Sequence, residues 1–207
     1  MSWLLSHLDD VAQATWEHLV LVALSVGIGF VISAILGVWA SRRPRVYPIV
    51  MGVSALLYTI PSLALFALLI PIVGLGRTAA IIGLVSYSLL VMVRNIATGL
   101  REVPDDVVEA ARGMGFGAWR LLLTIELPLA MPLIVAGVRI ATVTVIGIAT
   151  VAAYVNAGGL GTLIFAGIQQ AFPAKIVVGA VLTSLLAIGV DLILSRTERI
   201  LRSRRTG

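Results

Sequence analysis

The chain of 207 residues is 59% hydrophobic and 12% charged, which is about half the charged fraction of an ordinary soluble domain. Apolar stretches of about 20 residues, long enough to cross a hydrocarbon core, recur along it; the composition excludes a soluble globular protein and predicts an all-α, polytopic transmembrane helical bundle in one domain, residues 1–207. The net charge of +5 is expected at membrane edges rather than against nucleic acid, and the lack of cysteine excludes disulfides and thiolate metal sites.

The first predicted span covers about residues 19–40. Trp16 and Trp39 flank it, and tryptophan is enriched at both interfaces between membrane and water. No lysine or arginine precedes Arg42, whereas a cleavable signal peptide begins with basic residues. We therefore expect an uncleaved anchor whose N-terminus lies outside the cell.

Four further spans are predicted at about residues 48–72, 78–99, 130–153 and 175–194. Pro61 lies inside the second predicted span. A proline removes one backbone donor, so we expect a kink there in an otherwise continuous helix. Neighbouring hydroxyl groups can satisfy the carbonyl that the proline leaves free. The bundle would then have about five spans, each near the length that a membrane requires.

The arginines favour one orientation of this bundle. Loops on one predicted side hold a large group of them: Arg42, Arg43, Arg45, Arg94, Arg101, Arg112, Arg120, Arg196, Arg199, Arg202, Arg204 and Arg205. The opposite loops hold Arg77 and Lys175. Because cytoplasmic loops are enriched in basic residues, this distribution predicts an external N-terminus, a cytosolic C-terminus and a cytosolic loop at about residues 102–127.

The predicted cytosolic loop is polar and punctuated by glycines. Pro104 followed by two aspartates is typical of the start of a short helix. The apolar face of that helix would consist of Val107, Val108, Ala110, Ala111 and Met114. A second short helix, about residues 118–125, would lead to Pro128 at the next span. Such a rod can dock in a groove of another protein, or it can lie in the membrane interface as an ordinary amphipathic helix.

The spacing of residues within this loop favours docking on another protein over an ordinary interfacial helix. Glu109-Ala110-Ala111 is followed after three residues by Gly115, and Ile125-x-Leu127-Pro128 begins nine residues later. This pattern resembles the cytosolic coupling loop of the permease subunits of type I ABC importers. The resemblance implies that a cytosolic ATPase dimer binds the loop and moves it. The residues that it assigns to ATPase coupling are Glu109, Ala110, Ala111 and Gly115.

Further segments refine the resemblance. They are Thr59–Leu65, Val93–Asn95 with Thr98–Leu100, and Asn156–Gly161. Together they resemble the glycine betaine/carnitine/choline group of osmoprotectant permeases, although Val91 stands where that group is expected to have proline. Methionine-type permeases share the coupling loop and the Ala-Gly-Gly-Leu-Gly stretch, so an amino acid is the alternative substrate. The resemblance also implies a second permease copy or paralogue, an extracytoplasmic substrate-binding protein, and a place among the lipids of a bacterial or archaeal cytoplasmic membrane.

Several polar or aromatic residues in or near the spans are candidates for the translocation pathway: Tyr58, Thr59, Ser62, Arg139, Tyr154 and Asn156. An arginine inside a span is costly and is a functional candidate by default, but Arg139 can also reach the interface or pair with Asp191. A quaternary ammonium ion binds well over aromatic faces, which suits Tyr58 and Tyr154. Both tyrosines equally suit helix packing, and the resemblance implies that the high-affinity aromatic cage belongs to the binding protein.

The sequence shows no motif for a nucleotide-binding, metal or catalytic site. Its single lysine, Lys175, follows Ala174, so no phosphate-binding Gly-Lys-Ser/Thr loop exists. His7 and His18 cannot make a metal-ligand cluster. We therefore expect no catalytic residue, no metal and no cofactor, and an energy source in a partner ATPase. A passive osmotic channel and an interaction-only scaffold are the alternatives from other classes.

Overall fold

The computed structural model describes residue 3 and residues 6–203. The helices of this part are α2 (Leu8–Arg42), α3 (Val46–Thr59), α4 (Ser62–Val73), α5 (Arg77–Arg101), α6 (Asp105–Gly113), α7 (Ala118–Leu121), α8 (Leu127–Val151), α9 (Gly161–Gln169) and α10 (Pro173–Ser203). A π-helical turn, Leu122–Glu126, joins α7 to α8, and a 3₁₀ turn, Ala152–Val155, follows α8. The described residues form no strand, which confirms the all-α prediction.

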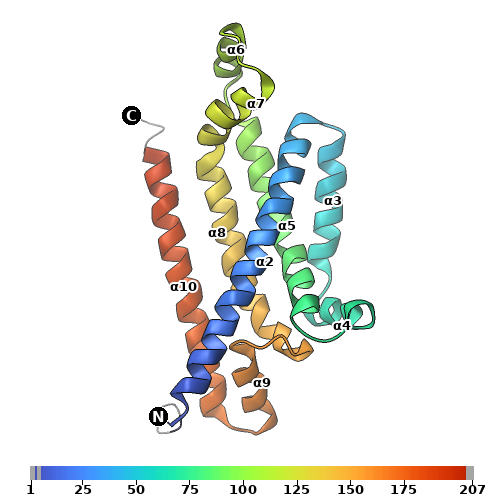
Figure 1. Ribbon diagram of the computed structural model, residues 1–207, viewed down its shortest axis with the longest axis vertical. Coiled ribbons are helices and arrows are strands. Elements are labelled where there is room, and N and C mark those ends of the chain that lie inside the picture. The colour runs from blue at the N-terminus through green and yellow to red at the C-terminus, as the bar shows by residue number, and fades with distance from the viewer. Residues whose placement is uncertain (1–2, 4–5, 204–207) are drawn as a thin grey trace.

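Four helical segments are long and apolar enough to cross a membrane: α2, α5, the run of residues 118–155, and α10. The pair α3 and α4 would make a fifth crossing. The start of α2 and the end of α10 lie at opposite ends of the bundle, as an odd number of crossings requires (Figure 1). The predicted polytopic bundle is therefore confirmed.

The second predicted span is wrong as a continuous kinked helix over residues 48–72. The chain bends by 98° between α3 and α4, and α4 lies across the end of α3 (Figure 1). Ile60 and Pro61 both have extended backbone, with ψ angles of 127° and 135°. A proline disfavours the helical conformation of the residue before it, so Pro61 breaks the helix at two successive residues. The hydroxyl of Tyr87 in α5 donates to the Ile60 carbonyl that the break leaves free.

The second short helix predicted at about residues 118–125 is not a separate element. The turn α7 continues through the π-helical turn into α8 as one run. Pro128 therefore lies in the first turn of α8 rather than at a break. The wider π turn ends at Glu126, one residue before Leu127-Pro128, and accommodates a residue that cannot donate a backbone hydrogen bond.

The observed helices differ from the predicted spans in two further respects, the length of the first and last helices and the presence of α9. The first and last helices extend beyond the predicted spans of 19–40 and 175–194, to Leu8–Arg42 and Pro173–Ser203. The helix α9 was not predicted from the sequence, because its nine residues are too few to cross a membrane.

Close helix contacts hold α2, α5 and α8 together. A Cβ atom on Gly37 of α2 would lie 2.6 Å from the Ile96 side chain of α5, and one on Gly137 of α8 would lie 2.5 Å from the Cβ of Asn95. Small residues let membrane helices approach closely and gain packing energy. Phe66, at the start of α4, is fully buried in the core cluster that these helices share.

This packing predicts a difference between two glycines of α8. Gly137→Ala should lower the free energy of unfolding by about 1–3 kcal/mol, because its new methyl group overlaps Asn95. Gly147→Ala should leave stability unchanged or slightly higher, since no described atom lies within 4 Å of its Cβ position. Thermal unfolding in detergent measures both. Equal midpoints for the two variants would contradict the packing described here.

Candidate coupling loop and translocation residues

The predicted coupling segment forms a separate projection at one end of the bundle. Helix α6 and turn α7 lie there, opposite the end that holds α9 (Figure 1). Pro104 precedes α6 with extended backbone, and Asp105 and Asp106 occupy its first turn. The carboxylate of Asp106 accepts the backbone N–H of Val107 at 2.9 Å. Both features favour a helix start, as the sequence predicted.

The residues predicted to couple to an ATPase divide between two faces of α6. Glu109 and Ala110 are exposed, whereas Ala111 is 1% exposed and faces the protein. The predicted apolar face is divided in the same way, since Val107 and Met114 are exposed. The exposed residues of α6 therefore combine apolar Val107 and Ala110 with charged side chains, those of Asp105, Asp106, Glu109 and Arg112. Such a mixed surface suits docking against another protein.

Gly115 ends this helix. Its φ angle is +82°, a left-handed conformation that side chains of L-residues rarely adopt. No described atom lies within 4 Å of its Cβ position. The backbone conformation, rather than crowding, accounts for glycine at this position of the motif.

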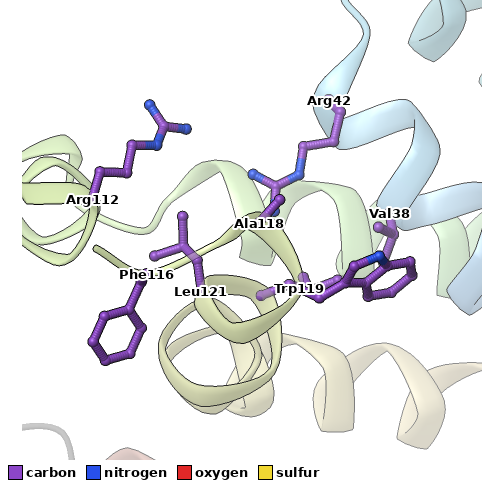
Figure 2. A pocket seen from close by; sticks show the side chains of 8 residues that line it. Val38, Arg42, Arg112, Phe116, Ala118, Trp119 and Leu121 are labelled. Atoms are coloured by element: carbon purple, nitrogen blue, oxygen red, sulfur yellow. The ribbon is translucent and has the colours of Figure 1, made fainter. Parts of the chain in front are cut away.

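A mostly apolar hollow of about 550 Å³ lies beside the segment, between the end of α2 and α7. Figure 2 shows Trp119 beside Val38 and Arg42, while Phe116 points away from them. Trp119 is 76% exposed, and Trp39 of α2 is also exposed. Exposed tryptophans near the end of a transmembrane bundle are typical of the membrane interface.

Two charged contacts at the base of the projection were missed by the sequence reasoning. Arg42 and Glu126 form an ion pair in which the two Nη atoms of the guanidinium group donate to the carboxylate. Arg101 donates to the carbonyl oxygen of Ala40. Glu126 occupies the variable position of the Ile-x-Leu-Pro pattern, and a carboxylate between apolar residues was the signal that could have indicated a buried partner.

Three of the pathway candidates surround the break between α3 and α4. Tyr58 is 37% exposed, and its ring meets the ring of Tyr87 edge-on at 6.0 Å between centroids. Thr59 donates its hydroxyl to the carbonyl of Leu56, so it satisfies its own helix end. Ser62 is the first residue of α4. The sequence named Tyr58 and Tyr154 as aromatic candidates, and the structure places the buried Tyr87 against Tyr58.

Tyr154 and Asn156 lie in the turn that follows α8. Both are exposed, and Asn156 has a left-handed φ of 60°. The glycine-rich signature begins here, and its residues Gly158 and Gly159 also have positive φ angles, which glycine adopts readily. The carboxylate of Glu17 in α2 accepts the backbone N–H of Gly159 at 3.1 Å, and the neighbouring His18 donates to the carbonyl of Ile146 at 3.1 Å. Glu17 therefore attaches the turn to the first helix, and His18 attaches α8 itself.

Arg139 is neutralised by two carboxylates of α10. Its guanidinium lies 2.8 Å from the Asp191 carboxylate and 2.9 Å from that of Glu198. The predicted pair with Asp191 is confirmed, and Glu198 is an additional partner. The two ion pairs join α8 to α10 and satisfy a charge that would otherwise be costly at this depth. A role of Arg139 in the pathway itself stays a prediction.

Comparisons with known proteins agree with this arrangement. Residues 18–205 match the protein family described as the binding-protein-dependent transport system inner membrane component. The chain is 37% identical to the glycine betaine/carnitine/choline transport system permease protein OpuCB of Bacillus subtilis, over 96% of this chain and 92% of the relative. It is 40% identical to the osmoprotectant import permease protein OsmW of Salmonella typhimurium, over 96% of this chain and 95% of that relative.

A solved structure shares the whole fold. A chain of the inward-facing MetNI methionine ABC transporter superposes with a TM-score of 0.83 at 27% identity, covering 95% of this chain and 98% of its own. The arrangement of helices over 95% of this chain is therefore similar to one found in a solved structure.

The turn after α8 yields a matched prediction. Gly159→Ala and Gly115→Ala should each lose about 1–2 kcal/mol of stability, because both glycines have a φ angle of +82°. Gly159→Ala should lose more, because its Cβ would lie 3.0 Å from the Nδ1 atom of His18, whereas no described atom lies within 4 Å of that position on Gly115. Thermal midpoints in detergent compare them, and an equal loss would show that the His18 contact contributes nothing.

Proposed function

This chain belongs to the family of binding-protein-dependent transport system inner membrane components, and we propose that it is the membrane-spanning permease subunit of an ATP-driven importer of compatible solutes. The observation that carries the proposal is the projecting helix α6, on which Glu109 and Ala110 are exposed at the spacing of a coupling loop. A permease of this kind is not an enzyme, since a partner subunit hydrolyses the ATP.

The substrate class rests on the relatives. Their names include glycine betaine, carnitine and choline, and they align with this chain over nearly its whole length. We assign the same class of small quaternary ammonium solutes to this protein. Tyr58, which is 37% exposed, offers an aromatic face of the kind that such a cation prefers, and the buried Tyr87 packs against it edge-on. Methionine is the alternative substrate, because the superposed solved structure belongs to a methionine transporter.

The mechanism needs partners that the sequence implied. Two permease chains, identical or paralogous, form the pathway at their interface, since few spans cannot enclose a path alone. A cytosolic ATPase dimer binds the outward face of each α6. An extracytoplasmic binding protein delivers the solute. Closure of the ATPases then displaces α6, and the spans alternate between inward-open and outward-open states.

The orientation follows from the same assignment. An ATPase is cytosolic, so the end of the bundle that carries α6 faces the cytosol. The N-terminal end of α2 then lies outside and the end of α10 lies inside. The many arginines near the α6 end support this placement by the positive-inside rule.

Uptake of labelled glycine betaine into vesicles tests the function. The vesicles would hold this permease with its cognate ATPase and binding protein, with or without internal ATP. We expect uptake that requires ATP and that unlabelled choline or carnitine competes for. Hydrolysis without betaine entry would reject the substrate, and methionine would be tested next. Betaine flux that is independent of ATP would reject the importer in favour of a channel.

The coupling role of Glu109 predicts a specific loss. Glu109→Ala should lower ATP-dependent uptake by about tenfold, because a charge-assisted hydrogen bond to the ATPase is worth about 1.5 kcal/mol. Glu102→Ala removes another exposed carboxylate of the same loop and should have no such effect. Uptake rates at matched amounts of permease in the membrane compare the two. Equal rates for wild type and Glu109→Ala would exclude Glu109 from coupling.

A further inference from the structure

Both ends of the coupling segment are attached to the same helix end. Arg101 is the last residue of α5, where the chain enters the segment, and its Nη2 donates to the carbonyl oxygen of Ala40 at 2.8 Å. Glu126 is the last residue of the π-helical turn, where the chain leaves the segment. Its carboxylate accepts both Nη atoms of Arg42, with Nη1 at 2.8 Å from Oε1. Ala40 and Arg42 belong to the last turn of α2.

The chemistry makes these contacts strong. The Glu126 side chain is 3% exposed, so its charge depends on Arg42 for compensation. The last carbonyl groups of a helix have no partner within that helix, and Arg101 supplies one. The Arg101 guanidinium also lies over the ring of Tyr47, 4.2 Å from its centroid, and so extends the attachment to α3.

The rest of α6 is loosely attached. Ala111 is the one buried residue of this helix. A polar cavity of about 270 Å³ separates α6 from the base, and Glu109 and Arg112 line it together with Arg42, Arg101 and Glu126. Because α6 has so little packing of its own, a displacement of α6 passes to the bundle mainly through the two ends of the segment.

We propose that Arg42, Arg101 and Glu126 form a base clamp that transmits movement of α6 to the first span. Through this base clamp α2 moves with α5 and α8 as one body when the coupling loop is displaced. The three residues are positioning residues, since they act through the contacts that join the helix ends. The inference rests on the proposed function, because it assumes that an ATPase moves α6. A π turn within a helix often marks a functional site, and the turn here ends at Glu126.

The test separates transmission from simple stabilisation. Glu126→Gln and Arg101→Met remove the two attachments singly with little change in size. In vesicles with the cognate ATPase and binding protein, the ratio of betaine imported to ATP hydrolysed would be measured. We expect this ratio to fall by about fivefold or more in each variant, the usual scale of coupling between sites. Arg101→Lys keeps a donor and should restore most of the ratio.

A matched control lies at the end of α10. Arg202 pairs with Glu198 there at 3.3 Å and is more exposed than Arg42. Arg202→Gln removes an arginine of the same membrane side outside the base clamp, and the ratio should equal that of wild type. If Glu126→Gln does not assemble, Arg101→Met decides the question, because Arg101 is exposed and its loss leaves no buried charge unpaired.

Each other outcome has a definite meaning. If uptake and hydrolysis fall in proportion in Arg101→Met and the ratio is kept, the contacts only stabilise the fold and the base clamp is rejected. If Arg202→Gln lowers the ratio as much, the effect is general to surface charge and the base clamp is also rejected. If wild-type vesicles show no ATP-dependent uptake, the proposed function itself fails and the base clamp fails with it.

Discussion

A carboxylate buried at the edge of a membrane must have a cation beside it, and this constraint organises the α6 end of the molecule. Glu126 ends the π turn, and Arg42, 84 residues earlier in the chain, provides the cation. The pair fixes where α8 starts relative to the end of α2. Arg101 fixes the end of α5 against the same turn. The three long helices that carry the core thus meet at one point, and α6 projects from it.

The opposite end of the bundle is held by different chemistry. Glu17 of α2 binds the turn after α8, and His18 binds the Ile146 carbonyl within α8. Arg77 at the start of α5 lies 3.6 Å from the Glu17 carboxylate. The same three helices are therefore joined at both ends. Tight contacts at Gly37 and Gly137 join them in between. A body of this kind transmits a displacement along its length rather than absorbing it, which suits a transporter driven from one end.

The sequence was sufficient for features that depend on local pattern. Hydropathy indicated the long apolar helices, although the second predicted span is broken, and the motif spacing indicated the short helix α6. Pro61 indicated a disturbance, but its size depends on Tyr87, which satisfies the freed carbonyl from another helix. The pair Arg139 and Asp191 was predictable because both charges lie in spans, where partners are required. Arg42 and Glu126 are 84 residues apart in the chain, so no local sequence pattern indicates that they form a pair.

The docking of α6 on a partner ATPase is the central claim, and labelling of a single cysteine tests it directly. The chain has no cysteine, so Ala110→Cys creates one exposed thiol on α6, and Ala111→Cys creates a buried one as a control. A maleimide reagent should label position 110 in the isolated permease and should fail to label it when the cognate ATPase is bound. Position 111 should react poorly in both cases. Equal labelling of position 110 with and without the ATPase would contradict the account.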